Sequence, residues 1–522
     1  MNLIYKKANI NGTTKTVGKH YVLTLSHLEQ LEKLAGKDTI DYSGVITVGI
    51  PKNKVTDTAG NQNDAITLTS GISVKGGTTS GSSKIVDVVD PIWERVSSTA
   101  SAADQTATIT VKGTDKYFKR SSLTADKIKV FVNGSQVTSN VTVTVDSNKT
   151  DVKASDGVTK IGEQYVVKVS GTGLAKDAKQ IKIQIQPNTL LDNSNNTNKA
   201  TDLLVYNTLI STSYESSITS GFLGSANSRN TNIKSIERQN IDNVTFVDNI
   251  PSTVYDKSAK KIVNENNTWD VSAMQDKSIL AWYTTNSNGT LKVNIGSDYE
   301  IFANQDGSYL FESIGYSDKC TSTETITNLA LLNVGSVISM YKMFYYTGYR
   351  SMTKLDLGSN FDTSNVISMN GMFQGTGYTA MTTLNLGSNF DTSKVTNMGN
   401  MFNSCGYTEM TTLTLGSKFN TSNVTTMGYM FYETGRQKLT TLNLGSSFYT
   451  SKVTDMQYMF YWMASLTTLN LGSNFDTSNV TNMAGMFWGT GSKSNGLTKL
   501  DLGTKFNTAK VTHMEKMFRY TG

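Results

Sequence analysis

Few residues of this chain have the types and spacing that catalysis or metal binding requires. The three histidines, His20, His27 and His513, lie far apart in the sequence, and no pair has the spacing of metal ligands. The glycine-rich stretches lack the lysine and the strand-then-helix context of a phosphate loop. Aspartate recurs at one position of a repeat, where other copies carry asparagine or tyrosine. We therefore expect no catalytic residue, no metal site and no cofactor, and interpret the chain as a protein that is not an enzyme.

Weaker possibilities for metal binding remain. Asp57, Asp64 and Asp192 lie in asparagine-rich turns, where oxygen ligands for calcium are available. Ordinary turn chemistry is the favoured explanation of these residues. A methionine stripe could bind copper(I), but we favour flexible core filler because the methionines follow a repeat. Cys320 and Cys405 are too few for a disulfide scaffold, and we expect both to be small, partly buried apolar side chains.

A Met-Phe doublet recurs through the last third of the chain. Its spacings are 29, 29, 29, 29, 27 and 31 residues, which indicates a stacked repeat array. Fourteen of the 20 methionines lie at two positions of this repeat. The doublets are Met343-Phe344, Met372-Phe373, Met401-Phe402, Met430-Phe431, Met459-Phe460, Met486-Phe487 and Met517-Phe518.

Each repeat contains a strand pattern followed by further inward-facing positions. In one copy, residues 381–386 read Met-x-x-Leu-x-Leu, which predicts a short strand with both leucines in the core. Val395, Met398 and Met401 follow at intervals of three, which predicts a 3₁₀ or short helical turn. Residues after the doublet, such as 374–380, are expected to form a protruding loop. A buried asparagine row is not expected, because Lys418 occupies the position of Asn389.

These repeats resemble a known family. Phe475-Asp-Thr-Ser-Asn-Val-Thr-Asn-Met483-Ala-Gly-Met-Phe487 is similar to the BspA-type leucine-rich repeat surface proteins, the DUF285 repeats. The lead-in Thr268-Trp-Asp-Val-Ser272 resembles the segment that precedes such repeats, so the resemblance covers roughly residues 236–522. It implies an exported bacterial protein of adhesive or host-interacting type.

The region before the repeats reads as β modules. Residues 86–210 contain short alternating strands, which predict an immunoglobulin-like β-sandwich. Its end matches residues 48–63 at an offset of 135, and Asp57-Thr-Ala-Gly-Asn61 resembles a loop of bacterial Ig-like domains. The first module lacks its opening strands, so we expect either a longer natural chain upstream or a cap formed by segment 26–45. The expected fold is mostly β, an Ig-like β-sandwich followed by a leucine-rich-repeat solenoid. The expected domains are 1–75 (truncated Ig-like), 76–85 (linker), 86–210 (Ig-like sandwich), 211–232 (linker), 233–325 (β-rich cap of the array) and 326–522 (seven repeats, truncated at the end).

Two surfaces of the array are candidate binding sites. One is a ridge of aromatic residues in the loop after Met-Phe, unless those rings lie flat and seal the edge of the core. The other is a polar ladder between the two leucines of each strand. The ridge comprises Tyr345, Tyr349, Tyr378, Tyr407, Tyr432, Trp462 and Trp488. The ladder comprises Asp356, Asn385, Thr414, Asn443, Asn470 and Asp501.

Charge and hydropathy limit the function classes. The net charge of +6 is spread without a dense basic run, which argues against nucleic-acid binding. No apolar stretch is long enough to cross a membrane, and the first residues are not a signal peptide. We expect an extracellular or cell-surface location, with the export signal upstream of residue 1, and a host or cell-surface protein or glycan as partner. The alternatives are a structural stalk of a larger surface protein and a eukaryotic parasite protein with the same repeats.

Overall fold

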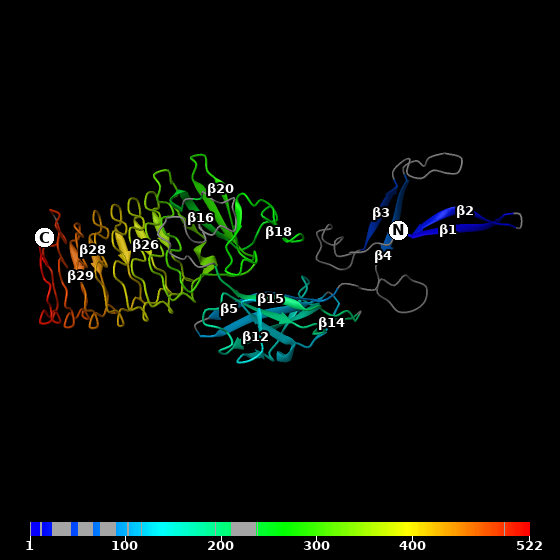
Figure 1. Cartoon of the computed structure of the whole chain (residues 1–522), viewed down its shortest axis with the longest axis horizontal. Helices are drawn as coiled ribbons and strands as arrows, with labels where there is room; N and C mark the ends of the chain where they lie inside the picture. Colours follow the sequence, from blue (N-terminus) through cyan, green and yellow to red (C-terminus); the bar gives the residue numbers. More distant parts are fainter. Residues whose placement is uncertain are drawn as a thin grey trace.

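The protein is mostly β, as expected (Figure 1). The computed structural model describes residues 90–101, 104–115, 117–193, 195–209, 236, 238–494 and 496–522, and it describes the backbone of four earlier strands. The helices within these ranges are three 3₁₀ turns of three residues each, and none could span a membrane. The two expected linkers, the loop with Asp57 and Asp64, and His27 lie outside the described residues.

The four earlier strands form two antiparallel hairpins. Strand β1 (Asn2–Ile10) pairs with β2 (Thr13–Val22), and β3 (Ser43–Ile50) pairs with β4 (Ile66–Ser73). The end of the expected capping segment 26–45 is therefore strand rather than helix, and its remainder lies outside the described residues.

Residues 92–207 form two antiparallel sheets around one core. Strands β6 and β13 alternate buried and more exposed residues, so that Ile109 and Ile183 face the same core. The predicted Asn133-Gly134 turn is present, with φ values of 49° and 82° that asparagine and glycine tolerate. The first sheet is β10 (Thr142–Val145), β12 (Lys160–Ser170), β6 (Thr106–Thr114) and β5 (Ile92–Ser101), with β11 (Thr150–Lys153) also on β12. The second sheet is β15 (Thr201–Asn207), β13 (Gln180–Ile185), β8 (Ile128–Val132) and β9 (Ser135–Val137), and β7 (Phe118–Ser121) pairs separately with β14 (Leu190–Asp192).

A mixed five-stranded sheet precedes the repeats. Its central strand β16 runs parallel to β21 and β23, while β20 runs antiparallel to β21. Its core residues, such as Val244 and Ile295, belong to the same apolar cluster as the repeat residues up to Met517. The order is β19 (Thr268–Asp270), β20 (Leu280–Thr285), β21 (Leu291–Gly296), β16 (Ile241–Val247) and β23 (Ile326–Thr327). Two small pairs lie beside it, β17 (Tyr255–Asp256) with β18 (Lys261–Ile262) and β22 (Ile301–Phe302) with β24 (Leu332–Asn333).

The repeats stack as coils, each with one three-residue strand. The strands are parallel and in register, so that Leu355, Leu384 and Leu413 lie side by side in the core. The doublet phenylalanines also stack from coil to coil, with ring centroids 5.5 Å apart for Phe344 and Phe373. The strands are β25 (Lys354–Asp356), β26 (Thr383–Asn385), β27 (Thr412–Thr414), β28 (Thr441–Asn443) and β29 (Thr468–Asn470).

The predicted helical turn before the doublet is wrong. Met401 N–H donates to the Met398 carbonyl within its own turn, but Phe402 N–H donates to the Met430 carbonyl of the next coil, at 2.9 Å. Between them, Asn400 has a φ of 57°, a left-handed conformation that cannot continue a helix. The spacing of three arises from a run of turns whose amides bond alternately to their own coil and to the next coil.

The predicted protruding loop is also wrong. Gly375 N–H donates to the Asn403 carbonyl at 2.8 Å, and Gly377 N–H donates to Thr347 at 2.9 Å. Thr376 is fully buried, and its hydroxyl donates to the Phe344 carbonyl. This segment therefore packs between its neighbours as part of the coil.

One coil was missed in the sequence. Leu310-Phe311 occupies the place of a Met-Phe doublet, and the Phe311 ring stacks on Phe344 at 5.2 Å. Phe311 N–H donates to the Met343 carbonyl at 2.8 Å, and Gly307 N–H donates to Ser339 at 2.9 Å. The expected strand at 309–311 is instead the first coil. An apolar-Phe pair 33 residues before Met343-Phe344 was the available signal.

A buried row of threonines joins successive coils and explains the variable aspartate position. Thr392 is fully buried, and its Oγ1 donates to the Asn420 carbonyl at 2.8 Å. Because the acceptor is a backbone carbonyl, the side chain at that position can vary. Where it is Asp or Asn, as in Asp391, its Oδ1 accepts from the amide two residues later, at 2.8 Å from Ser393 N. These carboxylates therefore form turns. The row comprises Thr363, Thr392, Thr421, Thr450 and Thr477.

Candidate functional site

All six residues of the polar ladder are exposed on the strand face. Most of them also hold the corner that follows the strand. The Oδ1 of Asn385 accepts from Gly387 N at 3.1 Å, and Asn443 and Asn470 make the same contact to a glycine two residues on. Asn385 Nδ2 also donates to Asp356 Oδ1 of the preceding coil, at 2.9 Å. The ladder keeps only part of its hydrogen-bonding capacity for a partner.

Three members of the aromatic ridge form one continuous stack. The rings of Tyr349 and Tyr378 are 4.7 Å apart and 13° from parallel, and those of Tyr378 and Tyr407 are 4.5 Å apart at 11°. The next coil places Arg436 at the same position. Its guanidinium lies 5.4 Å from the Tyr407 ring centroid, and its Nη1 donates to the Tyr407 hydroxyl at 2.7 Å. Since Glu433 pairs with Arg436 at 2.7 Å, this end of the stack is closed by an ion pair.

A second stack lies one column away. Tyr432 and Tyr461 are 4.4 Å apart at 14°, and Trp488 meets Tyr461 edge-on at 5.3 Å. Arg519 covers the Trp488 ring at 5.1 Å. Both stacks therefore run across three coils and end under an arginine.

The remaining two ridge residues make similar contacts. Tyr345 lies 4.2 Å from the Tyr346 ring and beneath Lys342, whose Nζ is 4.4 Å from its centroid. Trp462 lies 4.4 Å from the Arg436 guanidinium.

The stacking limits what the ridge can offer to a ligand. All seven rings are half-buried, and most ring faces are covered by a neighbouring coil. Burial, together with the neighbouring Tyr407 and Tyr349, raises the pKa of Tyr378 to about 12, so its phenol stays protonated at neutral pH. The surface therefore presents ring edges and neutral hydroxyls, while flat faces on which a sugar could stack are covered.

Glycines in the next coil make room for several of these rings. A Cβ at Gly375 would lie 2.1 Å from the Tyr346 ring, and one at Gly485 would lie 2.3 Å from Tyr458. Tyr458 also stacks on Tyr429 at 5.1 Å, a pair that was not predicted. The signal was an aromatic residue followed by glycine one repeat later.

The two cysteines are buried, unpaired thiols. Burial raises the pKa of Cys320 to about 12 and raises that of Cys405 further, so both thiols stay protonated. Cys405 replaces the buried threonine that neighbouring coils carry at Thr376 and Thr434. Within the described ranges, no three or more His, Cys, Asp or Glu residues are placed to hold a metal ion. The Asp192 carboxylate accepts from the backbone and side chain of Asn196, both at 2.7 Å, which is turn chemistry.

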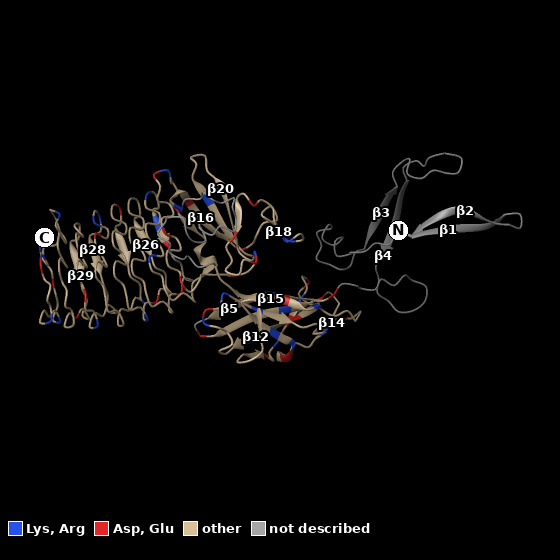
Figure 2. Ribbon diagram, in the orientation of Figure 1, with Lys and Arg blue, Asp and Glu red and all other residues tan. Residues whose placement is uncertain are grey.

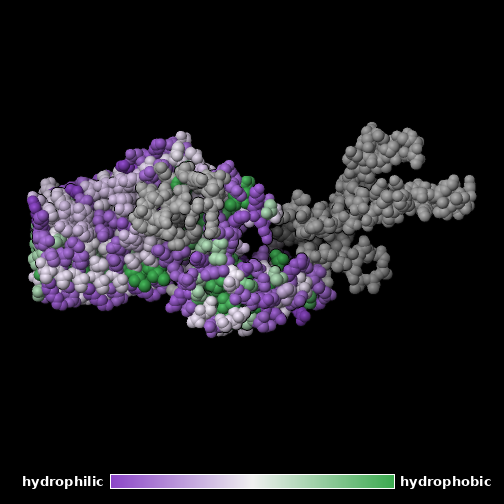
Figure 3. Space-filling model, viewed as in Figure 1, coloured by the Kyte–Doolittle hydropathy of each residue, from purple (hydrophilic) through white to green (hydrophobic). Residues whose placement is uncertain are grey.

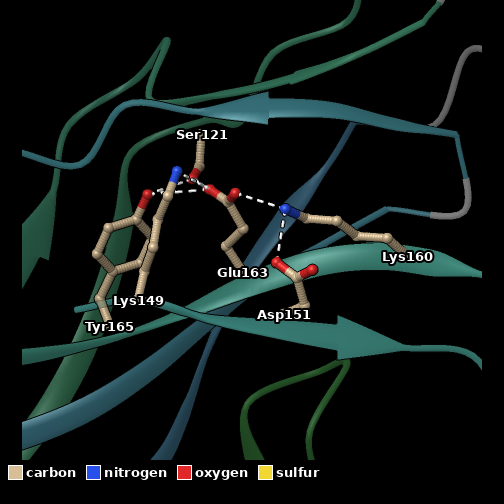
Figure 4. A network of polar contacts seen from close by, with 6 residues as sticks. All are labelled: Ser121, Lys149, Asp151, Lys160, Glu163 and Tyr165. Carbon is tan, nitrogen blue, oxygen red and sulfur yellow. Dashed lines mark hydrogen bonds and ion pairs between the residues drawn. The ribbon is translucent and has the colours of Figure 1, made fainter. Parts of the chain in front are cut away.

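The two-sheet module contains a buried carboxylate that was not predicted (Figure 4). Glu163 accepts from Lys149 Nζ at 2.6 Å and from Lys160 Nζ at 2.7 Å. Ser121 also donates to it, and the Tyr165 hydroxyl lies at 3.1 Å. Burial alone would raise the pKa of Glu163, but these donors lower it to about 2. The cluster ties β7 and the start of β11 to β12, and we interpret it as structural.

The Glu163 cluster predicts an acid-sensitive module. A carboxyl whose pKa falls from 4.5 to about 2 on folding adds stability above the higher value, and this is lost as pH falls through about 2. We expect Glu163→Gln to lower the free energy of unfolding by about 2 kcal/mol at pH 7, allowing for screening by solvent at the exposed lysines. Urea unfolding at pH 7 and pH 2.5 measures this, and the difference between the two proteins should shrink at pH 2.5. Glu94→Gln, at the exposed pair with Lys112, is the matched control; an equal loss there would contradict the assignment.

The repeat array matches one family model in three overlapping segments. Residues 315–438, 379–498 and 437–522 each match the family described as "Mycoplasma protein of unknown function, DUF285". This confirms the repeat family expected for this part of the chain. No curated protein and no solved structure matches the chain.

Proposed function

We propose that this chain is a bacterial cell-surface or secreted adhesion protein whose repeat array binds a protein or glycan of a host or neighbouring cell. In this proposal the two-sheet module is an Ig-like spacer and the array is a leucine-rich-repeat solenoid. The observation that carries it is the contrast between core and surface. The inward positions hardly change from coil to coil, whereas outward positions such as Asp391, Asn420 and Tyr449 differ. Figure 3 shows a mostly hydrophilic array surface, as suits a partner met in water.

The aromatic ridge remains our candidate contact surface, with a narrower chemistry. Stacked rings offer edges and hydroxyl groups, which suit hydrogen bonding to a protein better than stacking on a sugar. The rigid stack also fixes each hydroxyl before a partner arrives, which lowers the entropic cost of binding.

A screen for binding followed by paired substitutions tests this proposal. Purified protein is screened on host matrix proteins and on a glycan array. Replacing Tyr378, Tyr407 and Trp488 by serine is expected to abolish binding. The double variant Tyr378→Phe and Tyr407→Phe keeps the stack and removes two hydroxyls, so we expect about tenfold weaker binding.

The control is a matched change on another face. Thr383→Ser and Thr412→Ser alter the strand face and should leave affinity unchanged. Circular dichroism identifies variants that have unfolded. Binding that survives both tyrosine variants would exclude the ridge, and a chain that binds no protein or glycan in the screen would argue against adhesion.

The second candidate is a stalk that holds an active domain elsewhere in a larger surface protein. The observation that favours it is the direct contact between the two-sheet module and the array. Leu209 N–H donates to the Phe302 carbonyl at 2.8 Å, and Asn207 Nδ2 donates to Ser278 Oγ at 2.8 Å. A joint of this kind suits a spacer, and a negative binding screen would favour this function.

A further inference from the structure

One outward position of the array alternates between asparagine and lysine. Each lysine reaches back to the asparagine of the preceding coil, with Nζ to Oδ1 distances of 2.7, 2.7 and 2.6 Å. Two of the lysine pairs are separated by 58 residues, which is two coils. The position is occupied in order by Asn365, Lys394, Asn423, Lys452, Asn479 and Lys510. We call Lys394, Lys452 and Lys510 the lysine row.

The asparagines that hold these lysines are themselves fixed. Asn423 Nδ2 donates to the Ser393 carbonyl at 2.7 Å, and Asn479 Nδ2 donates to Ser451 at 2.7 Å. Each asparagine therefore bonds to the backbone with one end and to a lysine with the other. The ammonium groups are exposed and held in line, with further N–H groups available to a partner.

The lysine row is not neutralised by its own chain. Among the residues that the structure describes, no carboxylate lies within 4.0 Å of its three ammonium groups. Other cations of the array are paired, as Lys354 is with Asp356 at 2.8 Å and Lys438 is with Glu409. Residues 326–522 carry 14 Lys and Arg against 9 Asp and Glu. Figure 2 shows Lys and Arg at the turns along the edges of the array.

The carboxylates nearest the row in sequence have partners of their own. Asp391 Oδ1 accepts from Ser393 N at 2.8 Å, and Asp476 Oδ1 accepts from Ser478 N at 2.9 Å. Asp455 Oδ1 accepts from Gln457 N at 3.1 Å. These three groups reduce the local positive potential without pairing with the row.

A row of exposed threonines runs beside the lysine row. In the sequence Lys394-Val395-Thr396 the valine is buried, so the lysine and threonine project from the same side. Each threonine hydroxyl donates to the carbonyl of the preceding coil, at 3.1 Å for Thr425, which orients its lone pairs outward. The row comprises Thr396, Thr425, Thr454, Thr481 and Thr512.

We propose that the lysine row and the threonine row together bind a linear acidic polysaccharide that carries one anionic group on every second sugar. Adjacent coils are spaced like adjacent β-strands, so the ammonium groups repeat at about 10 Å. That period suits one charge per disaccharide of an extended glycan, and the threonine oxygens can accept from its hydroxyls. A nucleic acid carries a phosphate every ~3.4 Å along each strand, which a single widely spaced row would leave mostly unpaired. This inference rests on the proposed function and names the glycan class.

The test measures binding of the full chain to a hyaluronan oligosaccharide, which has one carboxylate per disaccharide. An uncharged chitin oligosaccharide of equal length is the comparator. The variant with Lys394→Gln, Lys452→Gln and Lys510→Gln keeps a polar group that can still donate to asparagine. We expect at least tenfold weaker binding to hyaluronan, and a shallower salt dependence by up to three released counterions.

A matched variant separates the row from net charge. Arg350→Gln, Lys354→Gln and Lys438→Gln remove three cations that already have carboxylate partners, and should change affinity less than twofold. Equal weakening by both variants, no effect of the lysine-row variant, or tighter binding of single-stranded DNA than of hyaluronan would each overturn the inference. If hyaluronan does not bind but a protein partner does, the inference fails and the proposed function stands. If neither binds, both fail.

Discussion

Replacing Phe402 with alanine is expected to lower the free energy of unfolding of the array by about 3–5 kcal/mol. Phe402 is fully buried, and its ring stacks on Phe373 at 5.6 Å and on Phe431 at 5.5 Å. It also packs 6.4 Å from Phe419. The cavity would open at the centre of the array, where each coil is held only by its two neighbours. Because stability in such arrays is nearly a sum of coil and interface terms, two interfaces weaken at once.

Denaturant unfolding followed by circular dichroism measures this effect. We expect a lower midpoint and a broader transition, since the two halves of the array become less coupled. Thr425→Ala, an exposed change one coil away, is the control and should shift stability by less than 1 kcal/mol. A change below 1 kcal/mol for Phe402→Ala would contradict the view that the phenylalanine stack couples the coils.

The repeated core could be read from the sequence because identical residues recur at a fixed period. Leu384 and Leu413, or Phe373 and Phe402, fill equivalent places, and recurrence alone identifies them. The helical turn was predicted wrongly because three-residue spacing suits both a helix and a run of turns. The deciding feature is the positive φ of residues such as Asn400, which the residue type permits and does not impose. The Leu310-Phe311 coil was missed because its doublet starts with a different residue and at a longer interval.

The candidate surfaces were less predictable, because they depend on contacts between coils. The sequence identifies Tyr378 as part of an aromatic column, but only the stacked structure shows that its faces are covered. The alternation of Asn423 and Lys452 is visible at the repeat spacing, yet it acquires meaning only when one coil lies against the next. Glu163 gave no signal, since its partner Lys149 is brought near it by the pairing of β11 with β12.

The joint between the two-sheet module and the array rests on one aromatic residue. Phe302 belongs by its backbone to β22, which pairs with β24 beside the repeats. Its side chain is buried in the core of the other module, 4.6 Å from the Tyr206 ring. Gln180 Nε2 also donates to Asp276 Oδ2 at 2.7 Å, and Arg95 lies 3.6 Å from Glu300. Since these polar contacts are partly exposed, Phe302 should dominate the coupling.

Phe302→Ala is expected to weaken this joint by about 3–5 kcal/mol and to split the unfolding of the chain into separate transitions. The alanine leaves a cavity beneath Tyr206 and removes the only aromatic group that this strand places in the two-sheet core. Calorimetry on residues 86–522 would show one transition in the parent protein and two in the variant. Phe302→Leu, which keeps most of the volume, should cost less than about 1.5 kcal/mol and preserve the single transition. If the parent already unfolds in two steps, or the alanine variant in one, then the two modules are not coupled through Phe302. A coupled joint would hold the array at a fixed angle to the two-sheet module, so that both candidate binding rows face a constant direction.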